Sequence, residues 1–334
     1  MLFSRRSWQI LASAASLVLA TNAFSQTTPP PLDPKTPPTP VQIIPVSLKN
    51  DFVAATVNGE KILIGDVKKI LESRPYPVTL TEEQKKQLRH AALDVLIEDA
   101  IMRQFLNKNV PQVNPADFNK EVQDLIEGLK KEMKTLDQFL TATNQTKEQL
   151  SRDIAAKLQW RVMLMRYCPE DKAKAYYIEN KMFFDKVFVK ASHILIKLDT
   201  KTPQADRVKA AEQLRVLRQE ILTGKTKFED AAKKYSECPS KDKGGDIGQF
   251  PYKFVVVPEF AKAAFSMKKG ELSDVVVTNY GLHLIWVTDR TAGELSTFDN
   301  IKDTVREVWA QDEDLYQRVL VDQRKNGNVK IEMP

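Results

Sequence analysis

The sequence predicts an α+β protein in which a small domain, with a four-stranded, mostly antiparallel sheet, is inserted into a mainly helical body. Short β-branched runs alternate with helical segments over residues 189–290. Helical periodicity dominates residues 51–188, and a single long apolar stripe occupies much of residues 291–334. That last stripe is too long to pack only on a domain of about 100 residues, so the two flanks are predicted to form one discontinuous domain.

The helical body is predicted to begin with a β-hairpin. The apolar runs Phe52–Val57 and Lys61–Ile64 are separated by Asn58-Gly59, a dipeptide that favours a tight two-residue turn. Thr81 and Gln84 then suit the capping box of a helix with a continuous apolar stripe. Three further helices are predicted over residues 115–133, 135–141 and 146–166.

The inserted domain is predicted to follow the order β-α-α-β-α-β-β. Val187–Lys197 is rich in β-branched and aromatic residues, which predicts a strand with His193 inside it. Helices are predicted over residues 203–223 and 228–235, and another short helix begins at Pro258. The remaining elements are a short strand among Gly244, Gly245 and Gly248, and a hairpin formed by residues 275–278 and 282–288.

One long helix is predicted after the inserted domain. Ser296 and Asp299 suit its start and Asn326-Gly327 its end, which gives about 28 residues and a length of roughly 42 Å. Apolar residues alternate over 329–333 and predict a final strand. These segments would complete the helical body on the C-terminal side.

Composition and charge bound the possible partners. The 334 residues are 42% hydrophobic and 28% charged, which is typical of a globular protein. The net charge of +6 includes Arg5 and Arg6, so loss of the N-terminal segment would leave about +4. That excess is too small to predict nucleic-acid binding.

The N-terminus has the pattern of a secretory signal peptide over residues 1–25. Arg5-Arg6 precede a short apolar core, and Ala23-Phe24-Ser25 suits cleavage before Gln26. The core is shorter than the roughly 20 residues of a membrane span, and no later stretch approaches that length. The arginine pair also fits a twin-arginine signal. We therefore expect an exported protein, periplasmic or otherwise extracytoplasmic, without a membrane span.

A Pro-rich linker is predicted over residues 26–50. Eight of the 18 prolines fall between residues 27 and 45, and such a composition cannot bury a core. The two cysteines, Cys168 and Cys238, would then meet an oxidising compartment. Two cysteines do not make a disulfide framework in a chain of this length, so two unpaired thiols are favoured, with a disulfide as the alternative.

Scarce polar residues gather in the inserted domain. His193, Cys238 and His283 supply two of the three histidines and one of the two cysteines, and Pro258-Glu259-Phe260 lies between them. In order and spacing this set resembles the parvulin family of peptidyl-prolyl cis/trans isomerases. With its flanks, residues 51–334 resemble the exported SurA/PrsA-type chaperones that carry a single parvulin domain.

The resemblance implies a parvulin-like domain inserted in a SurA N-like chaperone domain. It also implies an isomerase without metal or cofactor, acting on unfolded or proline-containing polypeptides. The implied catalytic residues are His193 and His283, as a hydrogen-bonded pair, and Cys238, facing the substrate carbonyl. Ile247, Val256 and Phe260 would hold the proline ring, and Thr278 would support the histidines.

Two substitutions keep a second function open. Val256 stands where the family often has methionine, and Tyr280 stands where it has serine or phenylalanine. The alternative is a holdase chaperone whose parvulin domain binds peptide without significant isomerase activity. Zinc binding and Cys-His proteolysis by the same residues lack the usual spacing or local signature. The paired arginines of phosphate-specific parvulins are also absent, because Thr202-Pro203 stand there.

Overall fold

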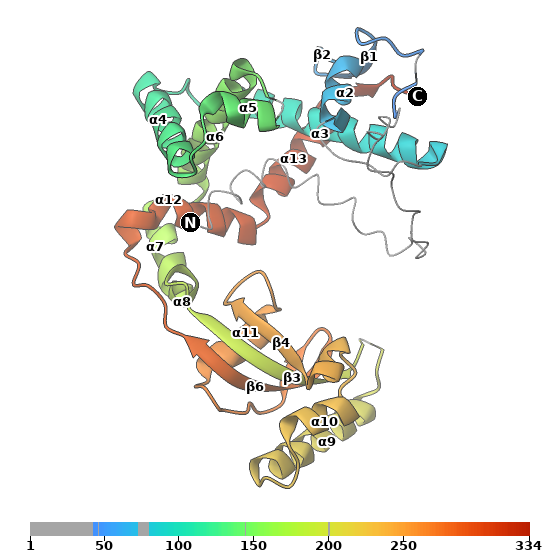
Figure 1. Cartoon of the computed structure of the whole chain (residues 1–334), viewed down its shortest axis with the longest axis vertical. Helices are drawn as coiled ribbons and strands as arrows, with labels where there is room; N and C mark the ends of the chain where they lie inside the picture. The colour runs from blue at the N-terminus through green and yellow to red at the C-terminus, as the bar shows by residue number, and fades with distance from the viewer. Residues whose placement is uncertain (1–42, 46, 73–79, 144, 200) are drawn as a thin grey trace. The chain divides into compact units, whose positions relative to one another are not determined.

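A computed structural model describes residues 43–45, 47–72, 80–143, 145–199 and 201–334 (Figure 1). The predicted signal peptide and most of the predicted linker lie outside these residues. Within them, no helix combines the length and the apolar character that crossing a membrane requires. The chain forms two compact units: the part up to Cys168 together with Ala310–Pro334, and the part Pro169–Trp309.

The first unit is mainly helical and includes a small antiparallel sheet of order β2-β1-β7. Segments from before and after the inserted domain contribute to this sheet, because the final strand, β7, pairs with the first, β1. Its elements are β1 (Val53–Val57), β2 (Glu60–Leu63), α2 (Ile64–Glu72), α3 (Glu82–Asn109), α4 (Pro115–Lys131), α5 (Leu136–Thr143), α6 (Lys147–Tyr167), α13 (Leu315–Asn326) and β7 (Val329–Ile331).

The start of α3 shows how local sequence defines this unit. The predicted capping box is present, with the Thr81 side chain accepting from the Gln84 N–H and the Gln84 side chain accepting from the Thr81 N–H. Packing begins before residue 51, since Ile43 and Ile44 are buried and the Arg89 guanidinium donates to the Ile43 carbonyl at 2.8 Å. The last residues of the predicted linker therefore belong to the packed body.

The single long C-terminal helix was a wrong prediction. The structure has two helices, α12 (Phe298–Asp312) and α13, separated at Glu313 and Asp314. Asp314 adopts a left-handed conformation with φ of 50°, which ends the regular hydrogen-bond ladder. The apolar stripe continues across the break, and residues 298–326 contain no glycine or proline, so neither of the usual helix breakers marks the break.

The second unit contains the four-stranded sheet, of order β4-β3-β6-β5, with every neighbouring pair antiparallel. This confirms the predicted α+β fold and its sheet. The elements are α7 (Glu170–Glu179), α8 (Lys181–Phe184), β3 (Phe188–Lys197), α9 (Gln204–Leu222), α10 (Phe228–Tyr235), the 3-10 helix η2 (Pro239–Lys243), β4 (Asp246–Pro251), α11 (Pro258–Ser266), β5 (Val276–Thr278), β6 (Gly281–Thr291) and most of α12.

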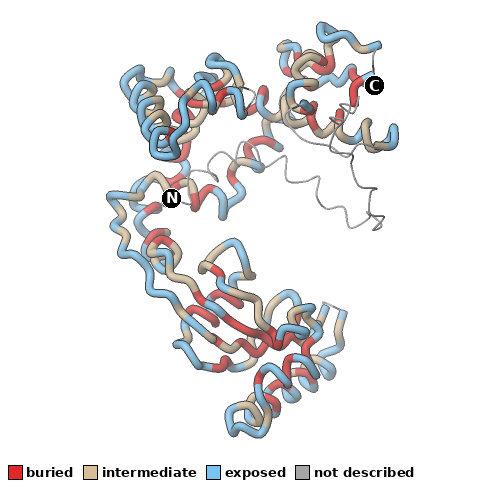
Figure 2. The backbone as a smooth tube through the Cα atoms, viewed as in Figure 1, coloured by how far each residue is buried: buried red, intermediate tan, exposed pale blue. Residues whose placement is uncertain are grey.

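The two faces of this sheet build two separate cores because side chains alternate along each strand. Ile194 and Leu284 belong to the core formed with α9 and α10. Val189 and Ile285 belong to the core formed with α11 and β4. Figure 2 shows the central strands β3 and β6 as largely buried, which agrees with their near-continuous apolar composition.

Candidate active site

Both predicted histidines lie on the sheet face that packs against α11. His193 is on β3 and His283 is on β6, and the antiparallel register pairs Leu195 with His283 and His193 with Ile285. The two histidines are therefore diagonal neighbours on one face, in the same alternation as Ile285. They are buried, with exposed fractions of 7% and 3%.

The histidines form a hydrogen-bonded and stacked pair. Their Nδ1 atoms are 3.1 Å apart, and their rings stack with centroids 5.3 Å apart and planes inclined by 19°. The Thr278 Oγ1 lies 2.8 Å from the other ring nitrogen of His283 and also accepts the Tyr280 N–H at 3.1 Å. The Thr278 hydroxyl thus fixes the orientation of the second ring from the neighbouring strand β5.

Burial keeps both histidines neutral at physiological pH. It lowers the pKa of His193 to about 4, and burial together with the proximity of His193 lowers the pKa of His283 to about 4. With both rings neutral, one Nδ1 donates and the other accepts the proton that they share. The pair is therefore a dry dipolar arrangement without net charge.

One nitrogen of the pair has no partner. The His193 Nε2 is buried and makes no hydrogen bond within the part of the chain that the structure describes. A buried polar atom without a partner is costly, so such an atom calls for an explanation.

An apolar wall adjoins the pair. Phe260 is 3% exposed, and its ring meets the rings of His193 and His283 edge-on, with centroids 5.6 and 5.5 Å away. Ile247 and Val256 are half-buried and pack against the same cluster. The structure thus brings together the neutral histidines and the three residues predicted to hold a proline ring.

Cys238 is tied to β3 by its backbone. The Ser236 Oγ accepts hydrogen bonds from the N–H groups of Leu195 and Cys238, at 3.1 and 3.3 Å, and the Glu237 N–H donates to the Leu195 carbonyl at 2.8 Å. Neither the half-buried Cys238 nor the buried Cys168 forms a disulfide. The Cys238 thiol is not hydrogen-bonded to the histidine pair. The two Nδ1 atoms contact each other, the His283 Nε2 contacts Thr278, and the His193 Nε2 has no partner among the described residues.

Comparison with known proteins identifies the domain that carries these residues. A family model described as "Rotamase: PPIC-type PPIASE domain" matches residues 193–289. A "Foldase protein PrsA" from Caldanaerobacter subterraneus is 31% identical over 284 residues, covering 79% of this chain and 83% of that protein. The chain belongs to the PrsA-type foldases. It is a parvulin-type peptidyl-prolyl isomerase with the build of a PrsA/SurA-type chaperone.

Two further relatives match this foldase over different lengths. The "Peptidyl-prolyl cis-trans isomerase Pin1" of Malus domestica is 42% identical over 110 residues, which is 29% of this chain and 90% of that protein. The crystal structure of a peptidylprolyl isomerase (PrsA) from Bacillus anthracis is 25% identical, covers 69% of this chain and 96% of that chain, and has a TM-score of 0.38.

A glycine of this parvulin domain places the first histidine. Gly245 has a φ of 86°, and a Cβ added to it would lie 2.5 Å from the His193 carbonyl oxygen. Its own carbonyl accepts the His193 N–H at 2.9 Å. Since only glycine allows this close approach at that backbone angle, Gly245 fixes the position of β3 at the site.

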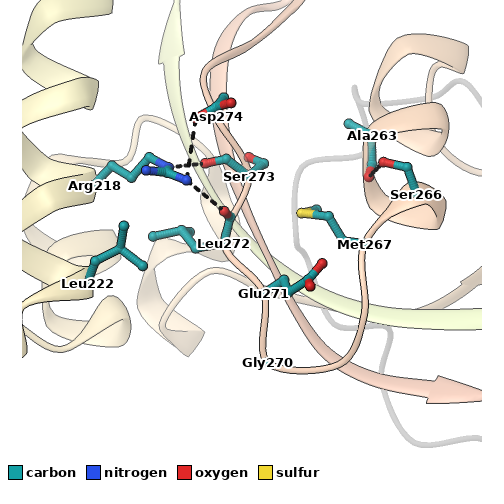
Figure 3. Close-up of a pocket in the computed structure, with 10 residues that line it drawn as sticks. All are labelled: Arg218, Leu222, Ala263, Ser266, Met267, Gly270, Glu271, Leu272, Ser273 and Asp274. Atoms are coloured by element: carbon teal, nitrogen blue, oxygen red, sulfur yellow. Dashed lines mark hydrogen bonds and ion pairs between the residues drawn. The ribbon is translucent and has the colours of Figure 1, made fainter.

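Other groups in the foldase support the site without belonging to it. A pocket of about 610 Å³ lies between α9, the end of α11 and residues 270–274 (Figure 3). Its Arg218 guanidinium donates to the Ser273 carbonyl at 2.8 Å and pairs with Asp274 at 3.4 Å. The Ser273 hydroxyl in turn accepts a hydrogen bond from the Ile285 N–H at 2.9 Å. These pocket residues therefore support β6, the strand that carries His283.

Sequence reasoning missed Ser236, which links Cys238 to β3. The available signal was a small hydroxyl residue two positions before the cysteine, which suits a hydrogen bond to nearby backbone. Tyr280, which was singled out beside the second histidine, contributes its backbone N–H, and its side chain is 60% exposed.

Proposed function

We propose that this foldase rotates X-Pro bonds of unfolded secreted or envelope proteins by a non-covalent mechanism. His193, His283 and Cys238 would act on the amide, and Ile247, Val256 and Phe260 would hold the proline ring. The observation that carries the proposal is the buried, neutral histidine pair in contact with Phe260. It places a dry polar group directly beside an apolar surface of suitable chemistry.

The physical reasoning follows from amide resonance. The X-Pro bond resists rotation because conjugation gives it partial double-bond character, with a barrier of about 18–20 kcal/mol. The twisted amide has lost that conjugation. A site that excludes water therefore favours the twisted amide over the planar, conjugated one. Neutral imidazoles in a dry site supply fixed dipoles without demanding a proton transfer or a covalent intermediate.

We further propose that the helical unit holds the unfolded client while the parvulin domain acts. That unit contains residues from both sides of the parvulin domain, which fits an insertion in a discontinuous chaperone domain. An exported location is proposed from the charged, apolar and small-residue pattern of residues 1–25. The mass of protein purified from the native host would test this, and we expect an N-terminus at Gln26.

The catalytic proposal is tested by the refolding of a protein whose slow phase is limited by proline isomerisation. Wild-type protein should accelerate that phase, and His193→Ala should reduce kcat/KM by about tenfold or more, since removing one preorganised polar group costs at least that much. His90→Ala is the matched control, because it removes the third histidine, which lies on α3 in the helical unit.

If wild-type protein left the slow refolding phase unchanged, the proposed catalysis of X-Pro rotation would be wrong. Equal loss in His193→Ala and His90→Ala would instead indicate a general effect on folding. Suppression of client aggregation without any acceleration would favour the holdase alternative.

A further inference from the structure

The loop at residues 252–257 carries part of the proposed proline-binding wall and has an unusual backbone. It joins β4 to α11 and contains Val256. Within it Phe254 has a φ of 70°, a left-handed conformation that a bulky aromatic residue rarely adopts. The loop is therefore held in a shape that its own sequence does not favour, and the contacts around Phe254 explain how.

Helices α7 and α8 supply these contacts. The Phe254 ring meets the Phe183 ring edge-on, with centroids 5.7 Å apart and planes inclined by 84°. The Lys253 ammonium lies 5.3 Å from the ring centroid of Tyr176. Phe183 and Tyr176 both precede residue 189, where the domain was predicted to begin, and both belong to the compact unit that contains the sheet.

The aromatic contacts continue into the base of the unit. Phe183 packs on the buried Phe184, and Phe184 packs on Tyr177, with centroids 5.4 and 5.7 Å apart. The Tyr177 hydroxyl donates to the Ser296 carbonyl at 2.6 Å. A continuous set of rings therefore connects the loop to a hydrogen bond on the segment that leaves the sheet after β6.

We propose that α7 and α8 are a working part of the isomerase site: Phe183 clamps Phe254 and so holds the loop that presents Val256 to the proline ring. This rests on the proposed function, because it assumes that Val256 contacts the substrate. Phe183 and Phe254 are positioning residues. The clamp is needed because Phe254 and Val255 are 43% and 60% exposed, so little else covers this side of the loop.

The expected kinetic effect is confined to substrate binding. The histidine pair is held by β3, β5 and β6, so loosening the loop leaves the polar groups in place. An aromatic pair of this kind is worth a factor of about three to ten in an equilibrium. Loss of the clamp should therefore raise KM for an X-Pro peptide roughly fivefold and leave kcat within about twofold.

The test uses the full chain, with Phe183→Ala, Phe254→Ala and the double variant, in steady-state isomerisation of one X-Pro peptide. Both single variants should raise KM, and the double variant should raise it no further, because either change removes the same contact. Phe183→Tyr keeps the ring and should retain the wild-type KM. Ile178→Ala is the matched control, since this α7 side chain is 72% exposed and lies outside the ring contacts described above.

An unchanged KM in Phe254→Ala, or additive effects in the double variant, would overturn the clamp. Thermal unfolding of each variant separates a folding defect in Phe183→Ala from a loosened loop, and Phe254→Ala changes only an exposed loop side chain. If the wild type proves inactive, the proposed catalysis fails while the clamp is still decided. The same variants would then be compared by affinity for a fluorescent proline peptide, with an equal affinity in all of them overturning the clamp.

Discussion

Two regions of the molecule hold ionisable groups away from water: the histidine pair on β3 and β6, and the carboxylates where α3 and α6 pack together. Burial lowers the pKa of both histidines to about 4. Burial and the nearby Asp99 carboxylate raise the pKa of Asp153, on α6, to about 6. In each case the charged form is disfavoured, yet the surroundings of the two sites differ.

The difference lies in what surrounds each group. Beside the histidines stand Phe260, a threonine hydroxyl and an unpartnered ring nitrogen. Asp153 instead accepts a hydrogen bond from the Gln145 side-chain amide at 2.9 Å, and its neighbour Asp99 lies 3.8 Å from the Arg103 guanidinium. A displaced pKa is common to both regions, so it does not identify the active site. What distinguishes the histidine region is the apolar wall that Phe260 forms against the two rings.

The largest expected effect is a loss of stability when Gly245 is replaced. It tests whether the histidine site depends on the close approach of the Gly245 backbone to His193. Gly245→Ala puts a methyl group 2.5 Å from the His193 carbonyl oxygen at a φ of 86°, and should destabilise the domain by about 3 kcal/mol. Gly248→Ala is the matched control, because its φ of 76° is similar but nothing lies within 4 Å of an added Cβ. The control should cost about 1 kcal/mol, from the backbone angle alone.

Urea unfolding, followed by circular dichroism, would measure both variants. Equal losses in the two variants would show that the backbone angle, rather than contact with His193, makes glycine necessary at residue 245.

The two regions should respond to acid with opposite signs. A histidine with a pKa of about 4 when folded and 6.5 when unfolded adds stability above pH 6.5, and that stability is lost as the pH falls towards 4. The loss should be about 3 kcal/mol for each histidine. The pKa of Asp153 is raised from 3.8 to about 6, so its contribution is present below pH 3.8 and is lost as the pH rises through 6.

Because Asp153 is only half-buried, solvent screening reduces its contribution to about 1–2 kcal/mol. Amide hydrogen exchange at pH 7.5 and 4.5, corrected for the intrinsic rate, would follow each unit separately. Asp153→Asn should stabilise α6 at pH 7.5 and have little effect at pH 4.5. A helical unit that loosened in acid as much as the sheet would contradict the assignment of opposite signs.

The same comparison explains what the sequence could predict. The strand β3 was predictable because its sequence is rich in β-branched and aromatic residues. The assignment of faces was not, because adjacent apolar residues such as Leu284 and Ile285 belong to different cores. The rarity of histidine then made His193 and His283 conspicuous. Nothing local predicts the left-handed Phe254, because its ring contact with Phe183 comes from a segment far away in the sequence. The extension of this unit to include α7 and α8 also depends on packing between segments far apart in sequence.

The smallest expected effect concerns the hydrogen bond that orients His283. Thr278→Val keeps the shape and the strand but removes the hydroxyl that serves both the His283 ring and the Tyr280 N–H. Losing one such bond costs about 1 kcal/mol, so kcat/KM should fall about fivefold. Thr278→Ser restores the hydroxyl and should recover most of the activity.

Tyr280→Ala separates this hydrogen bond from the unusual residue beside it. The Tyr280 side chain is 60% exposed and contributes only its backbone N–H to the site, so its truncation should leave kcat/KM within about twofold. If Tyr280→Ala lowered activity more than Thr278→Val, the aromatic side chain would contact the substrate directly. Tyr280 would then be a residue that adapts the site to its clients, and the rigid hydrogen-bond chain from β5 would matter less than the surface that the tyrosine presents.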